Sequence, residues 1–380
     1  MADRRPLPLV TVIATSFNHE RYVIECLESI RAQTYPNVQL IVADDASTDR
    51  SVELIRDWAR DTGTICTFLF HEENQGVCRT RNEALSLAEG AYVSGISTDD
   101  VWLPDKLAAQ VTQLEALPAT VGVSYGDAER MDADGNPLPG MFIEHTGVVR
   151  APPEGNIYEI LLDENFIPAM STLVRRECLE AVGPYDETLV YEDKDMWLRI
   201  ARRYEFVFSP HVGARYRVHP VSLSHMMSGA RKGAAWWEAD IAIYLKHIGY
   251  SPAWDAILWD RIARAAYRLD RPEQLEYARA NLRAGQSLRA LVLYWLCRLG
   301  VPYRRLERLK HSANGLVGRY AGGGGGRKRN PRVSSRSGAP RTSERSPKTS
   351  SRTSPSPEAD AAARSSSRLK TQLRNSVSKP

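Results

Sequence analysis

Two adjacent carboxylates, Asp99 and Asp100, are the residues whose type and spacing most directly indicate chemistry. They follow an apolar segment, residues 91–96, that predicts a short buried strand, and a helix is predicted to open at Pro104, where the fixed φ of proline suits a first turn. Ligands of open α/β sheets bind outside the carboxyl ends of strands. Two neighbouring acids repel each other, and a hard cation such as Mg²⁺ or Mn²⁺, bound to substrate phosphates, would relieve that repulsion. The pair therefore predicts a divalent-metal site, and a cap for the helix at Pro104 is the alternative interpretation.

Polar side chains also follow two earlier predicted strands. Residues 9–15 and 38–43 are apolar, β-branched runs, and they lead into Thr15 and Asp45. Because the carboxyl ends of parallel strands meet at one edge of a sheet, we expect these groups to converge with the two carboxylates. There Phe17 could stack on a planar base, and Asp45 could accept the ring N–H of that base.

Two arginines, Arg79 and Arg81, stand at the start of the next predicted helix, where they could meet phosphate. The chain has neither the G-x-G-x-x-G pattern of dinucleotide cofactor sites nor the G-x-x-x-x-G-K-[ST] pattern of ATP-binding loops. The remaining interpretation is a nucleotide held through its base, with its diphosphate on a metal.

These groups need a scaffold, and the first 130 residues alternate predicted strands and helices. Apolar residues recur at helical spacing between the strand-like runs. Strands are expected at 9–15, 38–43, 66–70, 91–96 and 121–125, with helices at 22–33, 49–60, 77–88 and after 104. Single helices between strands imply right-handed crossovers, so the expected fold is α/β, a mainly parallel sheet with helices on both faces.

Composition limits the class of protein. A chain of 380 residues with 43% hydrophobic content suggests two or three domains with a real core. The five cysteines form no C-x-x-C pair, which disfavours a zinc ribbon or disulfide framework and fits a reducing compartment. We find no signal peptide and no apolar run near the roughly 18 residues of a membrane span. We therefore expect a cytoplasmic protein that is soluble or peripheral.

The net charge of +4 hides an uneven distribution. From residue 327 onward, 14 lysines and arginines face three acids, and five glycines precede them. This Ser-, Arg- and Pro-rich segment, residues 319–380, has too few apolar residues to offset its ordering entropy and is predicted to be a disordered tail. Two roles remain open for this tail: a solvated appendage, or a segment that contacts anionic lipid. Because no aromatic residues interleave the arginines, we expect no specific nucleic-acid binding.

Residues 229–318 show aromatic and apolar residues at helical spacing and predict a helical accessory region. Within it, residues 288–310 combine an apolar stretch with several arginines. A basic amphipathic helix can lie on an anionic membrane, near a lipid-linked acceptor. Ordinary packing against the rest of the protein is the alternative.

Five segments resemble, in order and register, the motifs of the family 2 glycosyltransferases, inverting sugar transferases of the GT-A fold. The segments are residues 12–18, 33–49, 74–84, 97–107 and 191–199, and the resemblance covers residues 8 to about 225. It implies a catalytic domain over residues 1–228 that takes a nucleotide-sugar donor, a divalent metal, and a glycan or lipid-linked acceptor. In this chain Ser97 stands where the family often has a first acid, and Ala46 stands where a glycine is usual.

Donor-site roles follow from the resemblance residue by residue. It implies that Thr15, Phe17 and Asp45 hold the nucleotide base and that Arg81 reaches the base or the phosphates. Asp99 would contact the ribose or assist the metal that Asp100 ligates.

Acceptor-side roles follow in the same way. The resemblance implies that Asp193, paired with Glu192, is the general base. Arg217 and His219 are candidate phosphate or metal contacts, and a surface histidine without a role is the alternative for His219. The Glu-Asp pair also reads as a solvated acidic start of a helix.

The expected reaction is transfer of a sugar to an acceptor hydroxyl, with inversion at the anomeric carbon. A non-catalytic nucleotide-sugar-binding protein of the same fold is the alternative, with Ser97 in its favour. A sugar nucleotidyltransferase is disfavoured because its Gly-rich, Arg-bearing opening is absent. We expect the enzyme in the cytoplasm, and a peripheral position on the inner face of the plasma membrane is left open.

Overall fold

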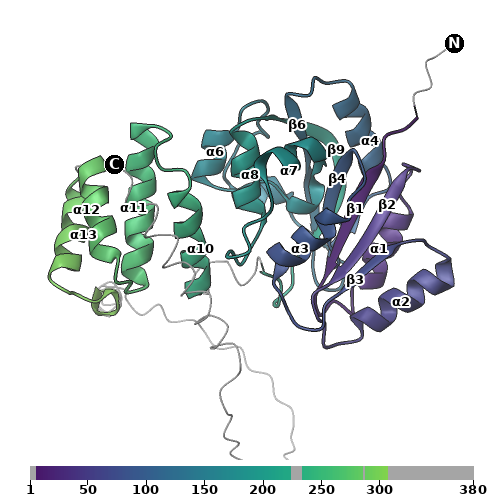
Figure 1. The fold of residues 1–380 in the computed structure, drawn as a ribbon, viewed down its shortest axis with the longest axis horizontal. Helices are drawn as coiled ribbons and strands as arrows, with labels where there is room; N and C mark the ends of the chain where they lie inside the picture. The colour runs from purple at the N-terminus through teal and green to yellow at the C-terminus, as the bar shows by residue number, and fades with distance from the viewer. Residues whose placement is uncertain (1–5, 224–232, 286, 307–380) are drawn as a thin grey trace, which may run out of the picture. The chain divides into compact units, whose positions relative to one another are not determined.

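The computed structural model describes residues 6–223, 233–285 and 287–306. The chain divides after Ile243 into two compact units (Figure 1). The domain boundary expected at residue 228 and the tail expected over 319–380 both lie outside the described residues.

One nine-stranded sheet forms the first unit (Figure 1). Its strands run in the order β3-β2-β1-β4-β8-β6-β9-β5, and β7 pairs with β6. Their bounds are β1 Val10–Ser16, β2 Val38–Asp44, β3 Thr67–Phe70, β4 Tyr92–Ser97, β5 Val101–Trp102, β6 Val121–Met131, β7 Pro137–Leu138, β8 Leu173–Arg175 and β9 Glu205–Arg217. The first four consecutive strands, β3-β2-β1-β4, are mutually parallel, as is the β6–β9 pair. β8 runs antiparallel to β4 and β6, and β5 to β9, so the sheet is mixed beyond β4.

The helices of this unit connect or follow the strands. They are α1 Val23–Arg31, α2 Ser51–Thr62, α3 Val77–Ser86, α4 Lys106–Glu115, α5 Phe142–Thr146, α6 Tyr158–Asp163, α7 Arg176–Val182, α8 Asp193–Ala201 and α10 Ala234–Leu245, which crosses the boundary between the units. The helix predicted to open at Pro104 begins two residues later. The α/β fold with a mainly parallel sheet is confirmed.

The core explains why the strands hold this order. Every residue of β1 is buried, as a central strand covered on both faces requires. On one face Val10, Val12 and Ala14 belong to the main hydrophobic cluster, which also contains Trp102 and Leu107 at the entry to α4. Burial on both faces fits the place of β1 inside the sheet, between β2 and β4.

From the sequence we also expect a strand over residues 167–175, and the strand in the structure is shorter. Ala169–Ser171 forms a 3-10 turn, and only Leu173–Arg175 is a strand. The hydroxyl of Ser171 donates to the Pro168 carbonyl at 2.7 Å, and that of Thr172 donates to the Ala169 carbonyl at 2.9 Å. These local bonds compete with sheet pairing, which the sequence pattern did not reveal.

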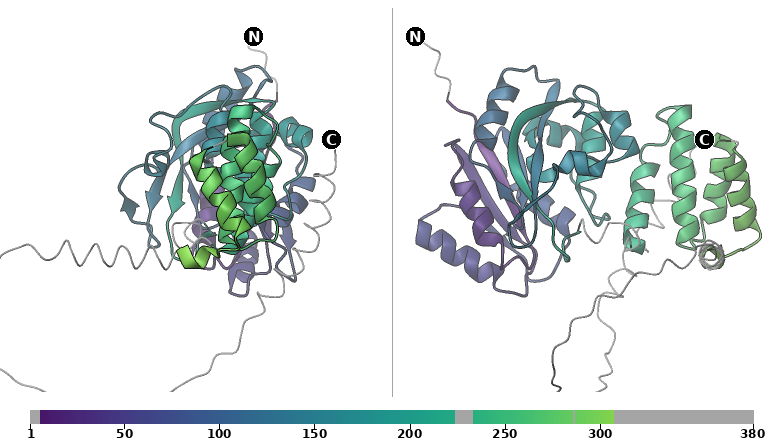
Figure 2. Two further views of the ribbon diagram at one scale, coloured as in Figure 1. Left: turned by 90° about the vertical axis from the view of Figure 1, so that its left-hand side faces the viewer. Right: turned by 180° about the vertical axis from the view of Figure 1, so that it is seen from behind.

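The second unit is helical, as expected. It contains α11 Pro252–Arg268, α12 Gln274–Gly285 and α13 Leu288–Arg298, which Figure 2 shows side by side in green. Ser251 and Ser287 cap α11 and α13 through their hydroxyls. Leu258 and Ile262 on α11 are fully buried in this unit. Among the residues described, no helix has both the length and the apolar character needed to cross a membrane.

Candidate functional site

The loops after β1, β2 and β4 are tied together at one edge of the sheet. The register sets Thr15 opposite Ser97 and Ser16 opposite Asp44. Beyond the strands, the Asp45 N–H donates to the Ser16 carbonyl at 3.0 Å, and the Thr98 N–H donates to the Thr15 carbonyl at 2.9 Å. The structure therefore brings the three polar strand ends together, as the pattern predicts.

The proposed base-binding residues lie at this edge in different environments. The Thr15 hydroxyl lies 3.4 Å from the Ile96 carbonyl, and its side chain is buried. Phe17 is 44% exposed, so its ring is free to stack on a planar group. Contact with a nucleotide stays a prediction for both.

Asp45 organises the turn that leads into α3. Its carboxylate accepts the N–H groups of Gln75 and Gly76 at 2.7 and 2.8 Å. The ring of His71 contacts the same carboxylate at 2.9 Å and also Glu83 at 3.0 Å. A carboxylate offers about four lone-pair directions, so one remains for a further donor. The predicted contact with a base N–H is compatible with this arrangement.

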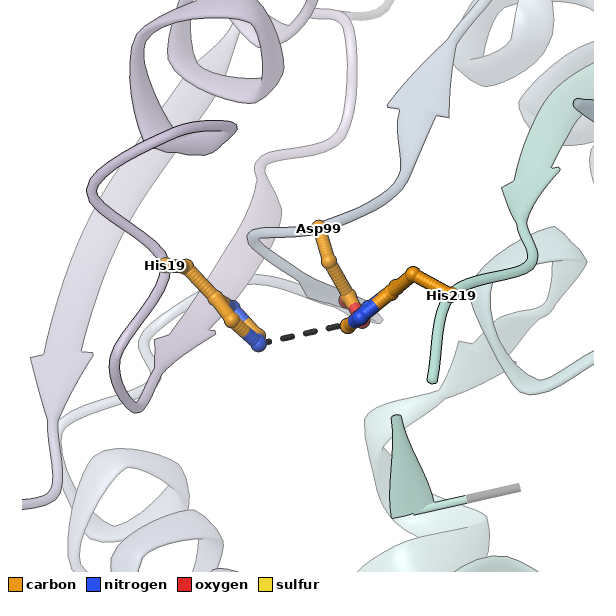
Figure 3. Close-up of side chains that lie close together, drawn as sticks. All are labelled: His19, Asp99 and His219. Atoms are coloured by element: carbon orange, nitrogen blue, oxygen red, sulfur yellow. Dashed lines mark hydrogen bonds and ion pairs between the residues drawn. The ribbon is translucent and has the colours of Figure 1, made fainter. Parts of the chain in front are cut away.

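Asp99 lies between two histidines, His19 and His219 (Figure 3). One Asp99 carboxylate oxygen is 2.9 Å from Nε2 of His219 and 3.7 Å from Nε2 of His19. One ligand-type atom from each residue lies within 4.8 Å of the others. The other carboxylate oxygen of Asp99 is buried without a hydrogen-bond partner, and so is Nδ1 of His219. A divalent cation suits this donor set because it would satisfy the orphaned oxygen.

Electrostatics keep Asp99 ready to bind a cation. Burial acts to raise its pKa, but the hydrogen bond from His219 and the nearby His19 hold the pKa down at about 2. Burial in turn lowers the pKa of His19, against the pull of Asp99. The resulting site pairs an ionised carboxylate with a neutral imidazole of His19, the states in which both groups ligate metals.

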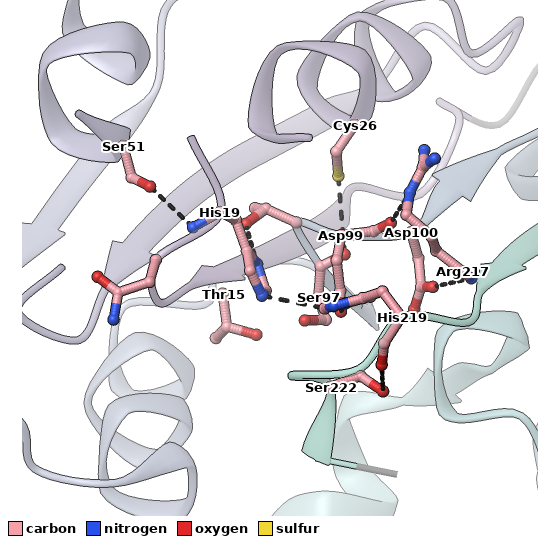
Figure 4. A network of polar contacts seen from close by, with 12 residues as sticks. Thr15, His19, Cys26, Ser51, Ser97, Asp99, Asp100, Arg217, His219 and Ser222 are labelled. Atoms are coloured by element: carbon pink, nitrogen blue, oxygen red, sulfur yellow. Dashed lines mark hydrogen bonds and ion pairs between the residues drawn. The ribbon is translucent and has the colours of Figure 1, made fainter. Parts of the chain in front are cut away.

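His19 is a site residue that the sequence analysis did not identify. Its Nδ1 contacts the Thr98 hydroxyl at 2.9 Å, and its backbone N–H donates to the Ser51 hydroxyl at 2.9 Å (Figure 4). The preceding Asn18 has a φ of 57°, which turns the chain back toward β4. Only its position in the sequence could have identified His19 as a site residue, because it lies three residues beyond the end of the buried strand β1, next to Asn18.

Asp100 points away from the two histidines and toward β9. Its carboxylate accepts the backbone N–H of Arg217 at 2.9 Å, and burial followed by the charge of Asp99 raises its pKa well above the usual range. The guanidinium of Arg217 donates to the Asp99 carbonyl at 2.8 Å and pairs with Glu25 at 2.6 Å. Among the described residues, the group that could hold a metal consists of Asp99, His19 and His219, and Asp100 is outside it. Its role as a metal ligand stays a prediction.

A second carboxylate pair, Glu192 and Asp193, stands at the start of α8. The Asp193 carboxylate accepts the Lys194 N–H at 2.6 Å and the side-chain amide of Asn165 at 2.8 Å. Burial, and then the charge of Glu192, raise the pKa of Asp193 to about 6. A buried acid with such a pKa suits a general base that works near neutral pH. Asn165 was not identified from the sequence.

Arg81 lies with this second pair in the structure. Its guanidinium is 3.3 Å from Glu192. Burial acts to lower the pKa of Arg81, but the charge of Glu192, followed by the neighbouring Tyr185, raises it. A Cβ on Gly95 of β4 would lie 2.6 Å from the guanidinium, so the side chain runs along β4. Arg81 and Cys78 share the buried face of α3, which directs the arginine inward. Its contact with base or phosphate stays a prediction.

Comparison with known sequences places this domain in a family. Residues 11–181 match the model described as glycosyl transferase family 2. The putative teichuronic acid biosynthesis glycosyltransferase TuaG of Bacillus subtilis is 31% identical over 170 residues, which are 45% of this chain and 63% of TuaG. WfaP of Escherichia coli is 29% identical over 226 residues, which are 57% of this chain and 80% of WfaP. Its name is UDP-Glc:alpha-D-GlcNAc-diphosphoundecaprenol beta-1,3-glucosyltransferase.

The match spans less than two thirds of TuaG and only 34% of another curated relative. Among solved structures, Staphylococcus aureus TarS 1–349 in complex with UDP-GlcNAc superposes with a TM-score of 0.54 at 20% identity. That likeness covers 75% of this chain and 83% of TarS 1–349, and it confirms the GT-A type of fold. Residues 11–181 of the chain are therefore similar to glycosyl transferase family 2, in sequence and in fold.

Proposed function

We propose that this protein is an inverting glycosyltransferase that moves a sugar from a nucleotide-diphosphate-sugar to a hydroxyl of a glycan or lipid-linked acceptor, with help from a divalent metal. The observation that carries the proposal is Asp193. A buried carboxylate with a pKa of about 6, at the start of α8 in a family 2 domain, is a general base for a hydroxyl.

On the donor side, Asp99, His219 and His19 would hold Mg²⁺ or Mn²⁺, with Asp100 beside them. When bound, the cation neutralises the charge that develops on the leaving diphosphate. Phe17 and Asp45 bind and orient the base, and Thr15 near the end of β1 also faces it. The loops that carry these residues are bonded to one another through the backbone, so the donor pocket is organised before the donor binds.

On the acceptor side, Asp193 takes the proton of the attacking hydroxyl as the new glycosidic bond forms. Attack occurs from the face of the sugar opposite the diphosphate, which gives inversion. Asn165 donates to one carboxylate oxygen, so it fixes the orientation of the base. Glu192 is held by Arg81, and its charge keeps the Asp193 pKa raised.

The names of the relatives suggest the partners. WfaP is named for a UDP-glucose donor and a diphosphoundecaprenol-linked acceptor, and TuaG for teichuronic acid biosynthesis. We extend to this chain a role in cell-envelope polysaccharide synthesis, with a lipid-linked acceptor, in the cytoplasm at the inner face of the membrane. The five free cysteines fit a reducing compartment.

The test is release of nucleoside diphosphate from a panel of UDP-, GDP- and dTDP-sugars with Mn²⁺, with Mg²⁺ and with EDTA. One donor should be turned over with metal, and Asp193→Asn should lower the rate about 10²- to 10⁴-fold, the range for a lost general base. Asp61→Asn, an exposed acid on α2, is the matched control and should leave the rate unchanged.

Three results would point elsewhere. Donor binding without release, even with lipid-linked acceptors, would favour the non-catalytic binding protein. Pyrophosphate in place of nucleoside diphosphate would indicate a nucleotidyltransferase. Full activity of Asp193→Asn would remove the general base from the proposal.

A further inference from the structure

One face of α13 is apolar and exposed to solvent. Five side chains make up this face, which we call the α13 stripe, and their exposed fractions are Leu288 77%, Leu291 40%, Val292 51%, Trp295 47% and Leu299 70%. Successive members are three, one, three and four residues apart, and at 100° per residue they fall on one side of a helix. An exposed contiguous apolar stripe of this kind marks an interaction surface.

The core of the helical unit does not account for this stripe. Ala290, Leu293 and Cys297 lie on the opposite side of α13 and are buried, where the helix packs against α11 and α12. The helix therefore has one apolar face for folding and a second one that the described part of the chain leaves uncovered.

Arginines flank the α13 stripe on both sides. By helical geometry Arg289 follows one edge of the stripe and Arg298 the other, and both are exposed. The guanidinium of Arg298 lies 5.4 Å from the ring centre of Trp295 and donates to the Tyr294 hydroxyl at 2.7 Å. Arg304 and Arg305 are also exposed, and residues 287–306 contain no Asp or Glu.

We propose that the α13 stripe inserts into the interface of an anionic lipid bilayer. The apolar side chains would enter the boundary between headgroups and acyl chains, while the flanking arginines pair with anionic headgroups. Trp295 has the amphipathic ring that favours this depth. The helix lies along the surface and does not span the bilayer.

The charge distribution favours an anionic bilayer over two other partners of the α13 stripe, which are the chain's own residues 307–380 and a second copy of the chain. Residues 307–380 carry 17 Lys/Arg against four Asp/Glu, so the chain's own tail repels the arginines of α13. A second copy would set arginine against arginine across a twofold contact. Residues 1–243 carry 22 Lys/Arg against 37 Asp/Glu, whereas residues 244–306 carry 11 against five. An anionic surface therefore attracts the helical unit and repels the catalytic one.

The experiment is co-sedimentation of the full chain with vesicles of phosphatidylcholine alone or mixed with phosphatidylglycerol, without donor or metal. The wild type should bind the anionic vesicles about tenfold or more tightly than the neutral ones. Leu291→Ser with Trp295→Ser should weaken binding to the anionic vesicles by about tenfold or more. Arg289→Gln with Arg298→Gln should reduce the preference for anionic lipid.

Ile65→Ser with Leu87→Ser is the control, because it removes two exposed apolar side chains from the other unit. Unchanged circular dichroism would show that the variants fold. Binding of the Leu291/Trp295 variant equal to wild type would assign attachment to the basic tail and overturn the proposal. The proposal would also be overturned if the wild type did not sediment with anionic vesicles. It would be overturned too if the wild type self-associated without lipid and the Leu291/Trp295 variant did not. The readout needs no turnover, so its failure leaves the proposed transferase activity standing.

Discussion

His19 would contribute an imidazole nitrogen to the candidate metal site, beside the Asp99 carboxylate and the His219 imidazole. Its Nδ1 is held by the Thr98 hydroxyl, which leaves Nε2 directed at Asp99. A hydrogen bond to the ring nitrogen that does not bind the metal fixes the tautomer of a metal-binding histidine. Two imidazoles and one carboxylate favour Mn²⁺ over Mg²⁺, because nitrogen ligands suit transition metals.

This arrangement predicts a metal preference that depends on His19. His19→Asn should weaken Mn²⁺ binding about 10- to 100-fold, with little effect on Mg²⁺. Electron paramagnetic resonance of Mn²⁺ with the donor-free protein measures the affinity directly. His145→Asn, an exposed histidine on α5, should bind like wild type. Equal Mn²⁺ affinity for the His19 variant would exclude His19 as a ligand.

The raised pKa of Asp193 predicts the acid limb of the rate profile. A base must be deprotonated, so activity should rise with pH through about 6. Glu192→Gln removes the neighbouring charge, so the limb should move to lower pH while burial keeps the pKa above that of a free acid. Initial rates between pH 5 and 8 measure both profiles. A limb that stays in place in Glu192→Gln would contradict the assigned cause.

The same shift predicts the stability of a variant. Because the folded-state pKa of Asp193 is raised above the usual value, folding penalises its charged form, and that penalty is present above pH 6 and relieved below it. Asp193→Asn should therefore melt no lower than wild type at pH 8, while it loses activity. Differential scanning fluorimetry measures this, and a large fall in Tm would indicate a structural role instead.

Ala46 occupies a backbone conformation that favours glycine. Its φ is 62°, in the left-handed region that costs an L-residue roughly 1–2 kcal/mol. Ala46→Gly should relieve that strain, but glycine loses about 0.5–1 kcal/mol more conformational entropy on folding. The net stabilisation of the fold should therefore be about 0.5–1 kcal/mol. Urea unfolding measures the difference. Ala108→Gly, inside α4, should instead destabilise by about 1 kcal/mol and serves as the control.

At the level of elements, the start of β4 depends on a close backbone approach. A Cβ on Gly90 would lie 2.5 Å from the Thr11 nitrogen, 2.7 Å from the Tyr92 oxygen and 2.8 Å from the Leu9 oxygen. These are all backbone atoms, so β1 and β4 would have to separate. Gly90→Ala should destabilise the protein by about 2 kcal/mol or more.

The matched change is Gly285→Ala in α12, where the nearest atoms lie at 3.8 Å or more. It should stabilise by up to about 1 kcal/mol, because alanine is the better helix former. Chemical unfolding of both variants checks the pair. Equal and small effects at the two positions would contradict the close approach at Gly90.

Local pattern predicted the elements well where one face is strongly apolar. α1, α2 and α3 and the first four parallel strands lie where periodicity indicated. The segment before β8 was different, because the hydroxyls of Ser171 and Thr172 form local bonds that compete with strand pairing. Arg81 is a second such case. Its side chain lies on the buried face of α3 and contacts Glu192, and helix periodicity alone did not show that an arginine would take that face.

At the level of the whole molecule, the chain divides into two compact units. Ile262 is fully buried in α11, within the helical unit. Ile262→Ala should destabilise that unit by roughly 2–5 kcal/mol, the cost of a large-to-small change in a core. Donor affinity should stay unchanged, since the donor-side residues all lie in the first unit. Calorimetric unfolding and isothermal titration with donor check this, and a parallel loss of donor affinity would show that the units are coupled.

The sequence by itself indicated the resemblance to family 2, the α/β scaffold and the strand ends that carry Thr15, Asp45 and Asp99. These features follow from periodicity, from the rule that ligands bind at carboxyl ends of parallel strands, and from motifs in register. The pair Glu192 and Asp193 was indicated by the resemblance to the family 2 motifs, whereas acids at a helix start by themselves also fit a solvated surface.

Only the tertiary structure decided how those groups combine. His19 meets Asp99 because Asn18 turns the chain with a positive φ, and His219 arrives from β9, 120 residues away along the chain. The raised pKa of Asp193 comes from burial, which depends on everything packed around it. Burial and long-range contact are properties of packing, so a linear pattern names the candidate residues while the fold sets their partners and charge states.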